Sequence, residues 1–421
     1  MQTPVEKERC TGCWACANGC PAGCISMEPD EEGFLYPKID AAACTDCGLC
    51  RRVCPAARSV PVEGDVPKAY ALHALDRELL EGSASGGGST LLAQRMLERG
   101  GVVFGAVFDE AFLVYHGRIE NMAELERFQG SKYPQSAVGD VYRQTKALLE
   151  RGTPVLFTGT PCQIAGLRAY LARDYEGLLC QDLICHSVPS PRVWRAYLSE
   201  LERAHGGRAA SVCFRHKAEG WTRYQFRVEF TDGEAAVMPG KDNPYMQAFL
   251  GGLICRPSCH QCPFKGLSRP SDITLADFWG VKQICPEALE RQGTTLALVH
   301  TEKGAAALEA LRERAAVTEV DPVAAVTYNR AALRPSPAAP RRKMFWRAYR
   351  GNGLEEIARR CLEPTLSQRV KTAAGGNPLL RAGGKCLHLL RKEEILSDFV
   401  LYLLQYVLST KLFLATIFRG C

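Results

Sequence analysis

The sequence predicts an α/β (α+β) body that follows a small cysteine-rich domain and precedes a helical C-terminal tail. Three observations predict this arrangement. Two cysteine runs with equal spacing occupy the start of the chain, apolar strand-like and helical segments alternate from residue 68, and an apolar stretch follows a basic segment near the end. With 421 residues, of which 46% are hydrophobic and 23% charged, the chain is long enough for about two to four domains.

The two cysteine runs define an N-terminal domain, which we assign to residues 1–60. Each run reads C-x2-C-x2-C-x3-C and is followed by proline. The members of the two runs are Cys10, Cys13, Cys16 and Cys20, and then Cys44, Cys47, Cys50 and Cys54. This spacing is the signature of bacterial two-cluster ferredoxins, in which the fourth cysteine of each run binds the other run's cluster. We therefore predict one [4Fe-4S] cluster on the first three cysteines of the first run with Cys54, and a second on the first three of the second run with Cys20.

Disulfide bonds and zinc are the alternatives to iron–sulfur clusters in a chain with 20 cysteines. The opening MQTPVEKERC has no apolar stretch like that of a secretory signal, so we expect a cytoplasmic, reducing location in which disulfides are rare. Zinc sites use other ligand spacings. Cys24, just outside the first run, is expected to be a small hydrophobic residue. Paired clusters pass single electrons, so this domain predicts electron transfer.

The body is predicted from alternating apolar segments of strand and helix length. We expect a hairpin turn at Asp232-Gly233, helices over 89–99 and from Pro161 onward, and strands over 68–75, 101–108, 153–159, 178–185, 221–230, 271–278 and 294–301. Residues 60–67 and 333–343 have the composition of linkers. We divide the body into an N-terminal part, residues 66–150, and a C-terminal part, residues 151–335.

A glycine- and serine-rich turn, residues 81–90 with the sequence EGSASGGGST, lies between a predicted strand and a predicted helix. Glycines let the backbone approach a ligand, and a helix N-terminus favours an anion, so a phosphate contact is natural here. A flexible loop is the alternative, because the turn matches neither G-x-G-x-x-G nor a P-loop.

A third group of cysteines lies in the C-terminal part of the body. Cys162 falls in the first turn of the helix that begins at Pro161, where the helix dipole stabilises a thiolate. Cys255, Cys259 and Cys262 follow one another in CRPSCHQCPFKG. With Cys162 or Cys185 they would supply four ligands, which favours a third [4Fe-4S] cluster, with zinc as the alternative. The role of Cys255 stays open.

Several classes of function lack support in the sequence. No G-x-S-x-G motif and no H-E-x-x-H pair is present, so nothing favours hydrolytic catalysis, and no catalytic residue is assigned. His186, beside Cys185, is the one histidine of interest. No nucleic-acid-binding module is recognisable. Residues 1–63 carry 6 basic and 9 acidic side chains, whereas residues 340–421 carry 15 basic and 6 acidic ones.

The C-terminal tail, residues 340–421, is therefore basic, and it contains the apolar segment 395–418. This segment is long enough to span a bilayer, but Asp398, Gln405 and Lys411 interrupt it. Three structures remain open: a membrane span, an amphipathic helix at a membrane surface, and a helix packed on the body or on another subunit. The tail thus allows a peripheral membrane association of an otherwise cytoplasmic protein.

Several motifs together resemble one known family. In chain order they are GSASGGGST, GSKYPQSAVGDVY (130–142), VLFTGTPCQIAGL (155–167), DLICHSVPSPRVW (182–194) and RPSCHQCPFKGLSRPSDITLADFWG (256–280). Their order and spacing over about residues 70–335 resemble the coenzyme F-420 hydrogenase/dehydrogenase beta-subunit family. The N-terminal dicluster ferredoxin domain resembles the arrangement in fused members of that family.

The resemblance implies an iron–sulfur flavoprotein oxidoreductase that passes electrons between ferredoxin-type clusters and FAD. It also implies hydride exchange with a small organic acceptor such as coenzyme F-420. The flavin would lie among Ser85, Gly86, Gly87, Thr90, Gly130, Ser131, Lys132 and Tyr133. The cluster beside it would be bound by Cys162, Cys185, Cys259 and Cys262.

The expected partners are an electron-carrying protein such as ferredoxin and further copies or subunits of a complex. Two other hypotheses are a non-enzymatic electron-transfer subunit that docks on a partner enzyme, and a membrane-peripheral adaptor that uses residues 385–421.

Overall fold

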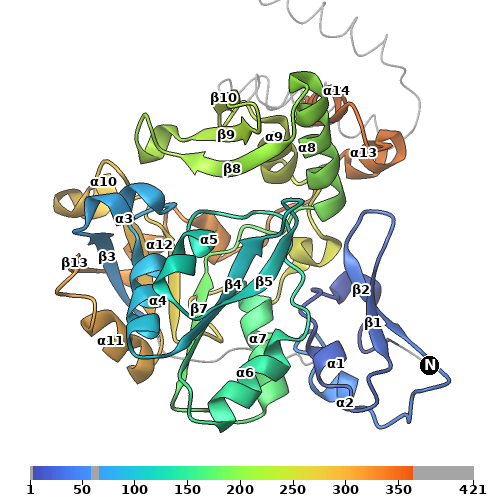
Figure 1. Cartoon of the computed structure of the whole chain (residues 1–421), viewed down its shortest axis with the longest axis horizontal. Coiled ribbons are helices and arrows are strands. Elements are labelled where there is room, and N and C mark those ends of the chain that lie inside the picture. The colour runs from blue at the N-terminus through green and yellow to red at the C-terminus, as the bar shows by residue number, and fades with distance from the viewer. Residues whose placement is uncertain (1–2, 58–65, 364–421) are drawn as a thin grey trace, which may run out of the picture. The chain divides into compact units, whose positions relative to one another are not determined.

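The computed structural model describes residues 3–57 and 66–363 (Figure 1). The chain divides into one compact unit of residues 1–361 and a second of residues 362–421. The apolar segment 395–418, and with it the three structures proposed for it, lies outside the described residues, as does most of the predicted linker 60–67. In the described part, no helix is long and apolar enough to cross a membrane.

A mixed eight-stranded sheet forms the centre of the body, in the order β13-β3-β12-β11-β7-β6-β4-β5. The strands are β3 (Lys68–Ala74), β4 (Val102–Phe108), β5 (Val114–Ile119), β6 (Val155–Thr158), β7 (Leu178–Leu183), β11 (Ile273–Asp277), β12 (Thr295–Val299) and β13 (Ala315–Val320). Strands β4, β6, β7 and β11 run parallel, and the remaining pairs are antiparallel. Six of the predicted strands belong to this sheet. Both predicted parts of the body contribute strands to it.

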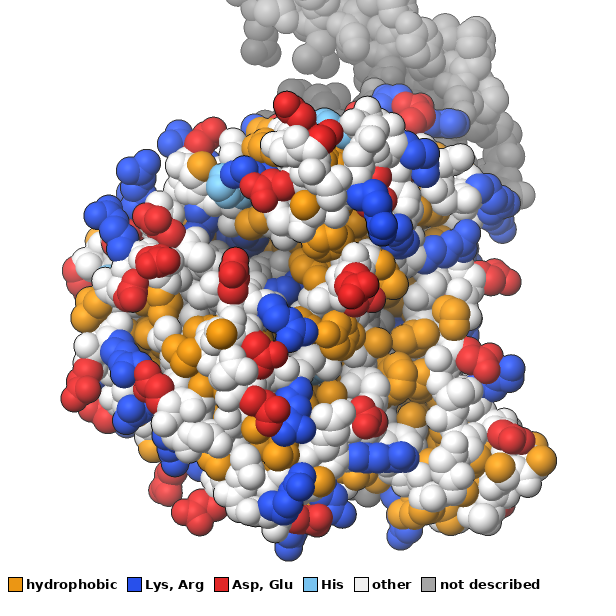
Figure 2. Space-filling model, viewed as in Figure 1, with side chains coloured by type: hydrophobic (Ala, Val, Ile, Leu, Met, Phe, Trp, Pro, Cys, Tyr) orange, Lys and Arg blue, Asp and Glu red, His pale blue; other side chains and the backbone are white. Residues whose placement is uncertain are grey.

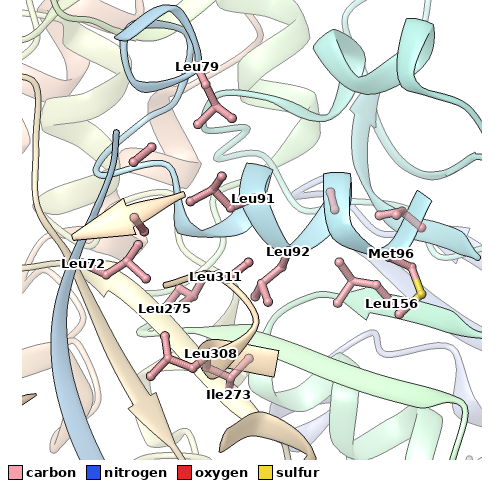
Figure 3. Packing of buried hydrophobic residues seen from close by; sticks show 14 of the residues in the cluster. Leu72, Leu79, Leu91, Leu92, Met96, Leu156, Ile273, Leu275, Leu308 and Leu311 are labelled. Atoms are coloured by element: carbon pink, nitrogen blue, oxygen red, sulfur yellow. The ribbon is translucent and has the colours of Figure 1, made fainter. Parts of the chain in front are cut away.

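Helices cover both faces of the sheet. On one face, α4 (Gly88–Glu98) buries Leu91, Leu92 and Met96 against strand residues, as Figure 3 shows. The same face carries α3 (Arg77–Gly82), α5 (Leu125–Phe128) and α11 (Glu302–Glu309). The other face packs on α6 (Val141–Glu150), α7 (Pro161–Leu171), α10 (Val281–Ile284) and α12 (Pro322–Val326). The predicted helices at 89–99 and from Pro161 are α4 and α7.

A second, antiparallel sheet of three strands lies beside the large one (Figure 1). Its strands are β8 (Ala209–His216), β9 (Gln225–Phe230) and β10 (Ala235–Pro239). The turn between β9 and β10 contains Gly233 at φ +89°, which a hairpin turn accommodates readily with glycine, as the sequence predicted. Trp194 of α8 (Pro191–His205) and Tyr245 of α9 (Pro244–Leu250) both pack against Phe214 of β8.

The N-terminal domain contains a hairpin and two short helices. They are β1 (Ile25–Pro29), β2 (Leu35–Ile39), α1 (Ala15–Asn18) and α2 (Leu49–Arg52). Cys13 and Ala15 belong to the same hydrophobic cluster as the buried residues of α6 and α7. Asn18 Nδ2 donates to the Gly139 carbonyl at 2.8 Å, and Ser190 Oγ donates to the Glu32 carbonyl at 2.5 Å. The domain is therefore packed directly on the body.

The body continues past the predicted boundary at residue 335. Residues 333–341 have no regular structure, but Ser336 is buried and donates from Oγ to the His186 carbonyl at 2.7 Å. The chain then forms α13 (Arg342–Ala348) and α14 (Leu354–Leu362), which bury Phe345 and Leu354. This predicted linker is therefore anchored on the body at the buried residues Ser336 and Ala339, while most of its other residues are exposed.

Candidate cluster and cofactor site

The two cluster loops of the N-terminal domain are repeats in backbone geometry as well as in sequence. Gly12 and Asp46, each two residues after the first cysteine of a run, have φ +67° and +53°. Trp14 and Gly48, two residues further on, have φ +66° and +68°. Left-handed φ values are uncommon outside glycine, so four at matched positions indicate one loop conformation used twice. In each loop, that conformation turns the chain around the central cysteine.

The structure brings the fourth cysteine of each run to the other run. Burial raises the pKa of Cys16 to about 12, and the nearby Cys10 and Cys54 thiols add to the rise. Burial likewise raises the pKa of Cys50, and Cys20, Cys44 and Cys47 add to it. Cys50 also acts on Cys16; the other neighbours are those that the crossed pairing predicts. Cys24 is buried, as expected, and its Sγ lies 3.3 Å from Cys20 Sγ.

The two cluster loops differ in exposure. All four cysteines of the first set, which includes Cys54, are buried, and Cys13 packs in the hydrophobic cluster of the body. In the second set Cys47 is exposed, and Cys44 and Cys50 are half-buried. The second cluster loop is therefore the one that a protein partner can approach.

Four cysteines of the body line one small cavity: Cys162, Cys185, Cys259 and Cys262. Cys162 lies at the start of α7, and Cys185 follows β7. Cys259 lies within a 3-10 turn, Pro257–Gln261, and Cys262 directly follows that turn. Strands β6 and β7 are parallel, so their carboxyl ends bring the first two cysteines to the same edge of the sheet. Thr11, next to Cys10 of the N-terminal domain, also lines this cavity.

Cys255, whose role the sequence left open, does not line that cavity. It is fully buried, with Sγ 3.0 Å from Ser187 Oγ and 3.3 Å from the Phe249 carbonyl oxygen. The structure thus places it apart from the four cysteines that face one another.

Burial makes the cavity cysteines hard to ionise. It raises the pKa of Cys162 to about 11 and that of Cys185 to about 12, and it raises the pKa of Cys259 as well. Nearby thiols add to each shift, since thiolates repel one another. A cationic metal core would replace the protons and relieve both effects. In the described residues, no group of three or more His, Cys, Asp or Glu side chains is close enough together to bind one metal ion. A [4Fe-4S] cluster does not need such a group, because each of its four thiolates binds a different iron.

A chain of hydrogen bonds holds the start of α7. His116 Nδ1 lies 2.9 Å from Ser136 Oγ, and Gln163 Nε2 donates to the same oxygen at 3.0 Å. Gln163 Oε1 accepts from the Thr160 amide at 2.9 Å, and Thr160 Oγ1 lies 3.1 Å from Cys162 Sγ. Burial lowers the pKa of His116 to about 4, so this histidine is neutral at pH 7. The network fixes the orientation of Cys162.

A much larger cavity, of about 630 Å³, adjoins the cysteine cavity. The two share Cys185, His186, Ser187 and Val188 in their walls. The carboxyl ends of β7 and β11 and the first turn of α4 also line the large cavity. In Figure 2, hydrophobic side chains gather across the middle of the visible face, below the part that β8–β10 occupy in Figure 1. The volume is within the range of cofactor and ligand sites, about 300–1,000 Å³.

Seven of the eight residues predicted around the flavin line this cavity: Ser85, Gly87, Thr90, Gly130, Ser131, Lys132 and Tyr133. Gly86 does not. A Cβ on Gly86 would lie 2.3 Å from the Leu72 carbonyl oxygen and 2.6 Å from the Thr295 amide nitrogen. Gly86 therefore lets the glycine-rich turn lie directly against strands β3 and β12. The sequence predicted that Gly86 contacts the flavin. The structure shows instead that Gly86 packs against the backbone of two strands.

Sequence reasoning missed the charged residues that shape the cavity. Lys217 is buried and donates to the carbonyls of Leu80 and Gln292 at 2.7 and 2.6 Å and to that of Ser85, in the glycine-rich turn, at 3.3 Å, so it ties the turn to its neighbours. Arg215, on β8, lines the cavity with a side chain only 4% exposed. Its Nη1 lies 2.8 Å from Asp277 Oδ2, while its Nε and Nη2 have no hydrogen-bond partner. No sequence motif marks either residue.

Comparison with known proteins gives two family matches. Residues 9–57 match the 4Fe-4S dicluster domain, and residues 152–325 match the family described as the C terminus of the coenzyme F420 hydrogenase/dehydrogenase beta subunit. A search of curated proteins gives no match. Among solved structures, a chain of the F420-reducing [NiFe] hydrogenase complex from Methanosarcina barkeri, in a xenon derivative, is 17% identical with a TM-score of 0.43. That alignment covers 74% of this chain and 93% of the other. By these matches, residues 152–325 of this chain belong to the family described as the C terminus of the coenzyme F420 hydrogenase/dehydrogenase beta subunit, and a 4Fe-4S dicluster domain precedes them at residues 9–57.

Proposed function

We propose that this chain is an iron–sulfur flavoprotein oxidoreductase that moves electrons between its ferredoxin-type clusters and FAD, with hydride exchange to an organic acceptor such as coenzyme F420. A third [4Fe-4S] cluster on Cys162, Cys185, Cys259 and Cys262 would connect the N-terminal domain to the flavin. One observation carries the proposal: the four-cysteine cavity borders Thr11 of the dicluster domain on one side and shares a wall with the large cavity on the other.

The large cavity suits FAD in its chemistry as well as its volume. The first turn of α4 supplies backbone N–H groups and the positive end of a helix dipole, which favour a pyrophosphate. Gly130, at φ +76°, has no atom within 4 Å of where a Cβ would be, so the backbone stays open to a ligand. FAD, when bound, supplies the exchange between single electrons and hydride, and the protein supplies position and electrostatics.

Arg215 supports an acidic ligand in the same cavity. Its two unpartnered nitrogens are buried, and a buried donor without a partner is unfavourable. A phosphate of FAD or an acidic group of the acceptor would satisfy them. Trp279, which also lines the cavity, is stacked on Trp221 at 4.9 Å between ring centroids and is 42% exposed. It offers a flat surface for a planar acceptor.

Electrons would enter or leave through the second ferredoxin cluster, whose loop is the exposed one. A one-electron protein carrier such as ferredoxin, or another member of a complex, would dock there. The alternative function is a non-enzymatic iron–sulfur subunit that only relays electrons to a partner enzyme. The beta-subunit family match and the dicluster domain support both functions, and the large cavity favours the first.

Lys132 predicts how FAD binding depends on pH. Burial lowers the pKa of Lys132 to about 8, so the side chain is protonated below that pH and loses its charge above it. Because FAD is anionic, its affinity is expected to be constant below pH 8 and to fall as the pH rises above 8. Lys132→Met should bind FAD at least about tenfold more weakly at pH 7, since hydrogen bonds to charged groups contribute about 1.5–3 kcal/mol.

The dissociation constant of FAD, measured by fluorescence titration between pH 6 and about pH 10, checks this prediction. This range extends to both sides of the lowered pKa of Lys132. Lys132→Arg is the matched control, because it keeps the charge over this range and should remove the fall. If Lys132→Met shows the same pH dependence as the unsubstituted protein, another group is responsible.

The proposed function itself is tested with reduced ferredoxin as donor and coenzyme F420 as acceptor, under anaerobic conditions. We expect F420 reduction that requires bound FAD and that stops when FAD is removed. A panel of other organic acceptors extends the assay. Flavin-free protein that still relays electrons from ferredoxin to a partner protein would favour the non-enzymatic role instead.

A further inference from the structure

Arg256 is a charged side chain with no exposed surface. Its backbone immediately precedes the 3-10 turn that carries Cys259, in the body. Its side chain reaches the N-terminal domain, where Nε donates to the Cys10 carbonyl at 2.7 Å and Nη2 donates to the Leu35 carbonyl at 3.0 Å. Nη2 also lies 3.6 Å from Cys10 Sγ. One residue thus joins the loop of the four-cysteine cavity to the first ferredoxin cluster loop.

The positive charge of Arg256 has no carboxylate partner in the part of the chain that the structure describes. Its other neighbours include Gln135 Oε1, which accepts from Nη1 at 2.9 Å, and the rings of Tyr36 and Phe34, whose centroids are 4.1 and 5.5 Å from Cζ. The fit is tight, because a Cβ on Gly12 would lie 2.7 Å from Nη1. A buried cation is strongly unfavourable unless an anionic group lies beside it.

We propose that Arg256 is the built-in countercharge of the first ferredoxin cluster, the one predicted on Cys10, Cys13, Cys16 and Cys54, and that it raises the reduction potential of that cluster. The proposal depends on the dicluster domain and not on FAD or on the identity of the acceptor.

The physical reason is the change of charge on reduction. A [4Fe-4S] core bound by four thiolates is an anion, and the arrival of one electron from a one-electron donor adds one negative charge while no bond forms or breaks. A fixed positive charge at 3.6 Å from a ligand sulfur stabilises the reduced state more than the oxidised one. An N–H group directed at that sulfur acts in the same direction.

The second cluster has no equivalent residue among those described. Arg143, which is exposed, donates to the carbonyls of Asn18 and Ala17 at 2.9 Å each, and to that of Cys20 at 3.2 Å. Arg143 therefore binds the backbone around Cys20, but it brings no buried positive charge close to a cysteine sulfur. Arg256 also acts electrostatically on Cys162 of the body. A higher potential at the first cluster would hold electrons on the side of the domain that faces the body.

The test is a reductive titration of the full-length protein with dithionite, monitored by electron paramagnetic resonance. Arg256→Gln and Arg256→Met remove the charge, and the methionine also removes the penalty of burying a polar group. Both should lower the equilibrium constant for reduction of the first cluster at least tenfold, which is about 59 mV for a one-electron couple. The second cluster should be unchanged. The signal lost in Cys54→Ser identifies the first cluster.

Two further variants separate charge from docking. Arg256→Lys keeps the charge and should recover most of the potential, whereas Arg143→Gln loosens the domain contact and should leave the potential unchanged. Loss of the first cluster from both neutral variants but not from Arg256→Lys would support the proposal, because the charge then holds the anionic cluster. Unshifted potentials in the neutral variants, equal shifts in Arg143→Gln, or loss of the cluster from all three Arg256 variants would overturn it.

Discussion

Replacing Cys162 with serine is expected to remove about four irons per chain while both ferredoxin clusters remain. The reason is geometric, since Cys162 faces Cys185, Cys259 and Cys262 across one cavity, and a [4Fe-4S] cluster needs a thiolate on each iron. The dicluster domain has its own eight cysteines and should keep about eight irons. Iron analysis and electron paramagnetic resonance of the anaerobically purified variant give the result directly.

Cys255→Ser is the matched control for this substitution. Cys255 belongs to the same cysteine-rich segment, but it is bonded to Ser187 and Phe249 and lies outside the cavity. The Cys255→Ser protein should therefore keep its full iron content. If Cys162→Ser keeps all its iron, Cys162 is not a ligand. If Cys255→Ser loses about four irons, the ligand set must include it. Zinc in place of iron would establish the alternative metal.

Double substitutions in the N-terminal domain should show which cysteines share a cluster. Cys10→Ser combined with Cys54→Ser affects one predicted cluster, so the double variant should lose no more iron than Cys10→Ser alone, about four atoms. Cys10→Ser combined with Cys20→Ser affects both clusters and should lose about eight. The different losses follow from the crossed pairing, in which Cys54 lies with the first run and Cys20 with the second.

Iron content and the number of resonance signals distinguish the two outcomes. If each run instead bound its own cluster, the Cys10/Cys20 pair would lose only about four irons and the Cys10/Cys54 pair about eight. That reversed pattern would contradict the crossed pairing. Circular dichroism of each variant provides the control for folding.

Local sequence patterns were sufficient where one segment determines its own structure. The predicted strands over 101–108 and 153–159 are continuous apolar runs, and they form buried central strands of the large sheet. The strands at its two edges, β5 and β13, were missed. β13 contacts the core on fewer sides and has one buried residue, Ala315, among half-buried and exposed ones. β5 is mostly buried, but His116, Gly117 and Arg118 interrupt its apolar pattern. The cysteine spacing predicted the dicluster domain that the family match confirms, because its cysteines lie close together in the sequence.

Contacts between distant segments could not be read from the sequence. Arg256 and Cys10 are 246 positions apart, and nothing in either motif indicates that a guanidinium reaches the sulfur. Arg215 comes from a strand that was not predicted, so its place in the cavity was also missed. The prolines and arginines of residues 333–343 predict a linker. Its contact with the body depends on Ser336, which donates a hydrogen bond to the carbonyl of His186, far away in the sequence.

The most direct test of an iron–sulfur flavoprotein is the iron and flavin content of anaerobically purified full-length protein, with its absorption spectrum. We expect about twelve irons and one FAD per chain, which corresponds to three [4Fe-4S] clusters and a flavin. About eight irons with no flavin would contradict the proposed function, because only the dicluster domain would then carry cofactors and the chain would only relay electrons.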